Sequence, residues 1–80
     1  MAMTHIGALI RERRIRRGMR VRDLAEAARV SASYIYAIES GNRGNHIEKL
    51  AAIARTLNID PGLLMKMAER TEEYHVRVNA

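Results

Sequence analysis

Residues 18–41, GMRVRDLAEAARVSASYIYAIESG, have the pattern of two short helices joined by a tight turn. Apolar side chains at helical spacing predict the first helix over about residues 21–28: Leu24, Ala25 and Ala28. Arg29 and Val30 then form the turn.

The second helix is predicted over about residues 32–39, with Ser31 as its N-terminal cap and Ile35 and Ile38 on its inner face. Two helices can cross closely through such a turn only where the side chains between them are small or apolar. In a helix-turn-helix, the second helix enters the major groove of DNA, and its N-terminal residues meet the base edges. The pattern therefore predicts double-stranded DNA as the partner.

Three more helices are predicted around this pair, over about residues 4–17, over about residues 46–57 and from residue 61 onward. Gly18 ends the first of them, and Asn45 is expected to cap the second. Their apolar faces are expected to include Ile6, Leu9, Ile10, Ile47, Leu50, Ile53, Ala54, Leu57, Leu63, Leu64 and Met67. The sequence thus predicts an all-α fold of five helices.

The last ten residues differ from the rest. We expect residues 1–70 to form one domain and residues 71–80 to form a tail. In the tail, Tyr74, Val76 and Val78 alternate with polar residues. This period of two fits a short C-terminal strand and equally fits a frayed terminus.

The charge is unevenly distributed along the chain, which carries 14 Lys and Arg against 9 Asp and Glu, a net charge of +5. Residues 1–45 hold nine basic residues, all arginine, against four acidic ones, whereas residues 46–80 hold five of each. Arginine pairs bidentately with phosphate and with guanine edges, so this excess favours a nucleic-acid partner. A solvated arginine-rich face is the other explanation.

Composition argues against several classes of protein. The chain has no cysteine, so disulfides and thiolate chemistry are excluded. No apolar run suits a signal peptide or a membrane span, so we expect a soluble cytoplasmic protein. The histidines (His5, His46 and His75) lack metal-ligand spacing, and the serines lack a catalytic partnership. We therefore expect no metal, no cofactor, no small-molecule substrate and no enzyme activity.

Short motifs continue this pattern in both directions: Gly18-Met19, Leu24-Ala25, Val30-Ser31, Tyr34-Ile35, Ile38-Glu39-x-Gly41, Ile53-Ala54, Leu57 and Leu63-Leu64. Together they resemble the Xre/Cro/lambda-repressor family of helix-turn-helix proteins over roughly residues 6–67. The resemblance implies a lambda-repressor-like DNA-binding domain that acts as a transcriptional regulator.

The resemblance also implies roles for individual residues. Arg14 and Glu39 are expected to form an ion pair that joins the first helix to the recognition helix. The implied base-facing positions are Ala32, Ser33, Tyr36 and Ala37. Two of these are alanines, which can touch only a thymine methyl group.

The implied contacts to the DNA backbone are Arg20, Val21, Arg22, Tyr34, Asn42 and Arg43. The family usually has a Ser or Thr cap and then Gln where this chain has Arg20 and Val21. Both polar contacts are therefore missing, and Arg22 is expected to supply charge in their place. Tyr34 either packs inside the domain or reaches a phosphate. Glycine is common in the family at the turn position that Arg29 occupies, so the resemblance implies that Arg29 lies near the left-handed backbone region.

A single domain of this size buries too little DNA to bind tightly, so we expect a homodimer on a palindromic operator, acting as a repressor. The candidate dimer surface is Leu63, Leu64, Met67, Tyr74, Val76 and Val78, although Leu63 and Leu64 could instead close the core. Phage repressor, restriction-modification controller and antitoxin all fit. The alternative function is a protein-interaction module on the same fold, which masks a partner protein.

Overall fold

Five helices follow one another in the part of the chain that the computed structural model describes, residues 6–41 and 46–67. They are α1 (Ile6–Arg16), α2 (Val21–Ala28), α3 (Ala32–Glu39), α4 (Ile47–Leu57) and a helix over residues 61–67. No strand occurs within these ranges, so the predicted all-α class and the order of the helices are confirmed. Thr4 and the predicted strand in residues 71–80 lie outside the described residues.

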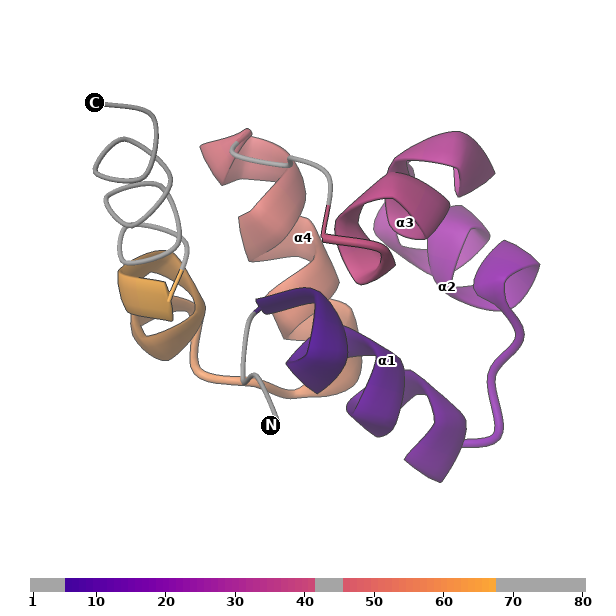
Figure 1. Cartoon of the computed structure of the whole chain (residues 1–80), viewed down its shortest axis with the longest axis horizontal. Helices are drawn as coiled ribbons and strands as arrows, with labels where there is room; N and C mark the ends of the chain where they lie inside the picture. The colour runs from indigo at the N-terminus through magenta and orange to yellow at the C-terminus, as the bar shows by residue number, and fades with distance from the viewer. Residues whose placement is uncertain (1–5, 42–45, 68–80) are drawn as a thin grey trace.

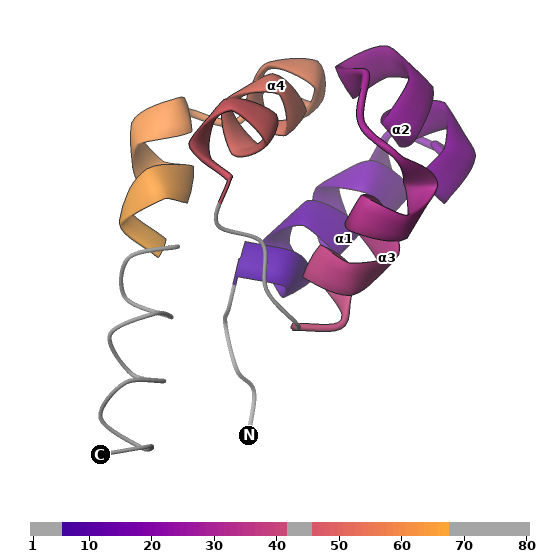
Figure 2. The same cartoon turned by 90° about the horizontal axis from the view of Figure 1, so that it is seen from above.

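The helices pack around one core, with α2 and α3 at one end of the molecule (Figure 1). Helix α4 and the helix over residues 61–67 lie next to each other toward the opposite end in both views (Figure 2). Helix α1 contacts both α3 and α4, and α2 contacts the same two helices. Helix α1 therefore packs against α3, and α4 packs against α2, so both helices of the predicted motif are supported by the rest of the domain.

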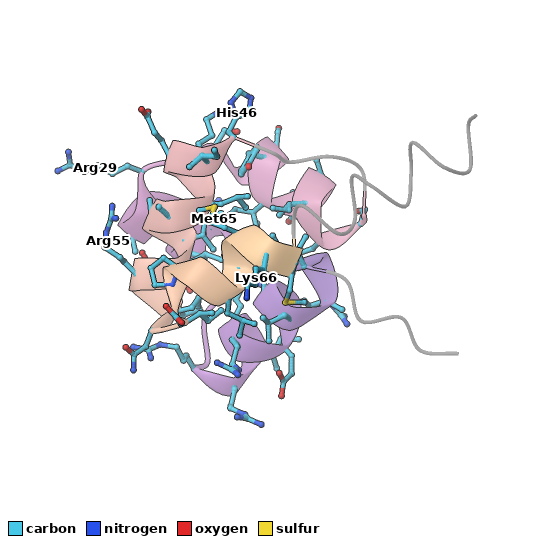
Figure 3. All side chains as sticks on the ribbon, turned by 90° about the vertical axis from the view of Figure 1, so that its left-hand side faces the viewer. Arg29, His46, Arg55, Met65 and Lys66 are labelled. Atoms are coloured by element: carbon cyan, nitrogen blue, oxygen red, sulfur yellow. The ribbon has the colours of Figure 1, made fainter. Side chains whose placement is uncertain are left out.

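The core is aliphatic, as the absence of Phe and Trp requires. Its largest fully buried side chains come from all five helices: Ile10, Leu24, Ile35, Ile38, Leu50, Ile53, Leu57 and Leu64. Met65 packs against this core between α4 and the helix over residues 61–67 (Figure 3). Two residues of the predicted apolar faces are exposed, Ile47 at 67% and Leu63 at 46%. Ile47 is the first residue of α4.

Three helices end in the same way, with the closing residue in the left-handed conformation: Gly18 (φ 71°), Arg29 (φ 61°) and Asn58 (φ 59°). In each case the next amide donates to the carbonyl five residues back: Met19 to Arg14, Val30 to Ala25 and Ile59 to Ala54. This pairing satisfies carbonyls that a helix end otherwise leaves free. The predictions that Gly18 ends the first helix and that Arg29 adopts a left-handed conformation are confirmed.

The helix starts are less uniform. Ser31 caps α3 as predicted, because its hydroxyl oxygen accepts from the Tyr34 N–H at 3.0 Å. Helix α4 starts after His46, which makes no side-chain capping bond, and the predicted cap Asn45 lies outside the described residues. Glu48 lies in the first turn of α4, where the helix dipole favours its charge.

Replacing Arg29 tests the backbone strain in the turn between α2 and α3. Arg29→Gly should raise the free energy of unfolding by about 1 kcal/mol, because only glycine occupies this conformation without a Cβ penalty. Thermal unfolding followed by circular dichroism measures the change. Arg29→Ala is the control, since it removes the guanidinium but keeps the Cβ. An equal gain in both variants would show that charge, and not backbone strain, is responsible.

Candidate nucleic-acid interface

Helix α3 has one buried face and one open face. Ile35 and Ile38 are almost fully buried and lie against the core. Ser33 and Tyr36 are exposed on the other side, and the Tyr36 side chain is 61% exposed. Of the four predicted base-facing positions, these two are therefore open, whereas Ala32 and Ala37 are half-buried.

Arg14 is a residue of α1. Its side chain reaches the end of α3 and makes three hydrogen bonds. Its Nε donates to Glu39 Oε2 at 2.7 Å, and its Nη2 donates to Glu39 Oε1 at 3.0 Å. Its Nη1 donates to the Met19 carbonyl at 2.8 Å. Both charged side chains are about nine-tenths buried. The hydrogen bonds that Arg14 donates to Glu39 raise the pKa of Arg14 above its usual value, so its guanidinium stays charged.

The start of α2 is stabilised by a contact between Arg20 and Asp23 that was not among the sequence-based predictions. Arg20 is the N-cap residue, and its side chain has no acceptor atom with which to cap the helix. Asp23 instead accepts from the Arg20 backbone N–H at 2.8 Å, from Arg20 Nε at 3.1 Å and from Arg20 Nη2 at 3.2 Å. Hydrogen bonds from Arg20 hold the pKa of Asp23 below its usual range.

The other predicted backbone contacts differ in how open they are. Val21 is half-buried and packs against the core, so it offers DNA little more than its backbone. Arg22 is exposed and makes no hydrogen bond or ion pair with the residues that the structure describes. Asn42 and Arg43 lie outside the described residues. Among the described residues, Arg22 is therefore an exposed cation in the first turn of α2 with no ion-pair partner.

Tyr34 is half-buried and joins α3 to α4. The Lys49 ammonium lies 4.8 Å from the centre of its ring, and the His46 ring meets it edge-on at 6.1 Å. Burial raises the pKa of the Tyr34 hydroxyl. Of the two predicted roles, the structure shows the packing role. Sequence spacing could not indicate this cluster, because its members come from different elements.

The predicted dimer residues separate into core and surface. Leu64 is fully buried in the core of its own chain, which favours the alternative that it closes the core. Leu63, on the same helix, is 46% exposed, and Met67 is half-buried. Tyr74, Val76 and Val78 lie outside the described residues.

Residues 6–41 and 46–67 also bear on metal binding and on membrane insertion. No three His, Asp or Glu side chains in these ranges are grouped so that they could hold a metal ion. None of the helices described there is long and apolar enough to cross a membrane.

A serine-capped helix that crosses its predecessor through a tight turn, with its far side open, defines a helix-turn-helix domain. The chain belongs to this family: the family model described as a helix-turn-helix domain matches residues 5–65. This match and those to solved structures agree with the Xre/Cro/lambda-repressor resemblance. The fold is that of DNA-binding transcription regulators.

Two solved structures are similar to the chain. The clp gene regulator ClgR from Corynebacterium glutamicum is 30% identical, with a TM-score of 0.68 over 91% of this chain and 84% of that one. SinR, solved in a complex with the SinI protein, gives 28% identity and a TM-score of 0.70 over 92% and 75% of the two chains. No curated protein sequence matches the chain.

Removing the charge of Glu39 tests the bond between α1 and α3. Glu39→Gln should lower the free energy of unfolding by about 3 kcal/mol, because it leaves Arg14 as a buried cation with no carboxylate to neutralise it and only neutral oxygens as acceptors, among them the Met19 carbonyl. Urea unfolding measures this loss. Glu26→Gln removes an exposed carboxylate from α2 and should change stability by less than about 0.5 kcal/mol. Similar small losses in both variants would contradict the structural role of the pair.

Proposed function

We propose that the chain is a sequence-specific transcriptional regulator that binds a palindromic operator as a homodimer, with α3 in the major groove. The observation that carries this proposal is the open face of α3 (Ser33 and Tyr36) on a helix whose other face is locked into the core. A rigidly held helix with a polar open face suits reading of base edges. We propose further that the protein acts as a repressor by occupying a promoter.

The charged groups around α3 support binding to the DNA backbone. Arg20 and Arg22 lie at the start of α2, where the helix dipole adds partial positive charge. Arg43 follows α3 along the chain and is proposed as a third contact. These residues position the protein on any duplex, whereas Ser33 and Tyr36 discriminate between sequences.

The dimer is proposed on the side of the molecule away from α2 and α3. Leu63 and Met67 lie on the helix over residues 61–67, and the tail residues Tyr74, Val76 and Val78 are proposed to extend this surface. A pair of half-sites about one helical turn apart then doubles the DNA contact. Its larger buried surface is what raises affinity into the operator-specific range.

A protein partner is the second candidate, and one comparison favours it. SinR, which shares this fold, was solved in a complex with the SinI protein. The small Ala32 and Ala37 side chains on α3 also leave room for a flat protein surface. The two functions differ in their dependence on salt, because apolar protein contacts release few counterions.

Selection of binding sites from a random duplex pool at near-physiological salt tests the proposed function. An enriched palindrome, with half-sites about one turn apart, is expected. With three arginine contacts in each protomer, log K should fall with log salt with a slope of about −5. A folded protein that enriches no sequence would remove operator recognition and leave the protein partner as the better candidate.

Two classes of variant separate positioning from sequence reading on the selected operator. Arg22→Ala should weaken binding to the operator and to unrelated DNA alike, and should make the salt slope shallower by about 0.9 for each protomer. Tyr36→Ala should instead change the order of preference among operator variants. A uniform loss with Tyr36→Ala would contradict the base-reading role of that side chain.

Leu63→Glu tests the dimer surface. Placing a charge on this exposed position should weaken self-association at least about tenfold, because the carboxylate loses its water in the interface. Sedimentation equilibrium measures the dissociation constant. Ile47→Glu is the matched control, since Ile47 is equally apolar and 67% exposed but lies on α4. Removal of residues 72–80 without loss of self-association would exclude the tail from the interface.

A further inference from the structure

The N-cap position of α2 is occupied by an arginine whose side chain is already held in the free protein. Asp23, one turn into the helix, accepts from the Arg20 backbone N–H and from two nitrogens of its guanidinium, at 2.8, 3.1 and 3.2 Å. One carboxylate thus fixes both the start of the helix and the direction of the side chain. The family's usual Ser or Thr at this position has no charged group that could be held in this way.

The contact uses only one edge of the guanidinium. Asp23 takes the edge formed by Nε and Nη2, and the edge formed by Nη1 and Nη2 remains open. The Arg20 side chain is 77% exposed, so this open edge is accessible to solvent, while the Asp23 side chain is only 35% exposed. A planar guanidinium can therefore keep its carboxylate and still form a bidentate pair with a phosphate.

We propose that Asp23 is a positioning residue for DNA binding, which holds Arg20 so that its open edge meets a backbone phosphate. This role rests on the proposed function, since Arg20 contacts DNA only if the chain binds DNA. A free arginine loses rotamer entropy when it is fixed on a phosphate. In this protein the two side-chain hydrogen bonds to Asp23 restrict that freedom before DNA arrives, so binding costs less.

If Asp23 positions Arg20, replacing Asp23 should change DNA affinity in the direction opposite to that expected from charge alone. Removing a carboxylate close to DNA should strengthen binding if the carboxylate does nothing but repel phosphate. If Asp23 positions Arg20, its removal should weaken binding although the net charge of the protein becomes more positive. The direction of the change therefore separates the two explanations without any assumption about its size.

Fluorescence anisotropy on the operator enriched from the random pool measures the effect. Asp23→Asn should weaken binding about threefold to tenfold, which corresponds to the entropic cost of immobilising one long side chain. The same substitution in an Arg20→Ala background should leave affinity unchanged or slightly higher, because the group to be positioned is gone. Glu26→Gln removes another exposed carboxylate from α2 and should leave affinity unchanged or higher.

A second variant keeps the test valid if Asp23→Asn loosens the start of α2. Arg20→Lys retains the positive charge and the backbone N–H bond to Asp23 but lacks the fork, so it should show a similar loss of affinity. In the free protein, the Arg20 Nε–H signal in NMR spectra should exchange slowly with water and should lose this protection in Asp23→Asn. This readout does not require DNA.

The outcomes separate the two proposals. Tighter binding by Asp23→Asn, or an equal loss in the presence and absence of Arg20, overturns the positioning role but leaves the regulator intact. An unprotected Arg20 Nε–H in the free protein also overturns it. Failure of the unmodified protein to enrich any duplex removes the proposed function and, with it, the role of Asp23.

Discussion

The orientation of α3 depends on the guanidinium of Arg14. Three of its nitrogens bind Glu39, at the end of α3, and the carbonyl of Met19, in the linker that leads to α2. The core around this group is entirely aliphatic, and burial of aliphatic side chains is non-directional. A bidentate arginine–carboxylate pair has a defined geometry, so it can fix the rotation of α3 about its axis. Ser33 and Tyr36 face outward only in that rotation.

The turn between α2 and α3 imposes the second constraint. Arg29 adopts a left-handed conformation, and the Val30 N–H then closes onto the Ala25 carbonyl at 3.0 Å. Ala25 and Ala28 are buried on α2, the helix that packs against α3 and α4. Larger side chains at these positions would separate the helices, and the Arg14–Glu39 pair could no longer form at the far end of α3. Turn and ion pair thus depend on each other through the packing between them.

Hydrophobic periodicity was sufficient to predict the helices and most of the core, because one apolar face in each helix must be buried. It failed at Ile47, since a pattern shows which side of a helix is apolar and not how far its neighbours extend along it. The same limit explains Leu63 and Leu64: both are apolar, but only the fold shows that Leu64 completes the core. The Arg14–Glu39 pair could be expected only from the family resemblance, because its members are 25 residues apart.

The contact between Arg20 and Asp23 shows another limit of reading charge from sequence. The two residues are three positions apart, so their proximity on a helix was predictable, but the edge of the guanidinium that remains open was not. Net charge treats such a pair as neutral. A guanidinium with two hydrogen-bonding edges can keep one carboxylate and still bind an anion, so pairing does not remove it from a DNA surface.

The arginines that make up the excess of positive charge have different roles. Arg14 is used inside the fold, and Arg16 is bound to Glu12 on its own helix at 2.9 Å. Arg29 and Arg55 project at the edge of the face formed by α4 and the helix over residues 61–67 (Figure 3). The positive charge is therefore distributed around the molecule, and net charge alone would attract DNA to several faces. Under the proposed function, productive binding depends on the arginines at the start of α2, where Asp23 holds Arg20.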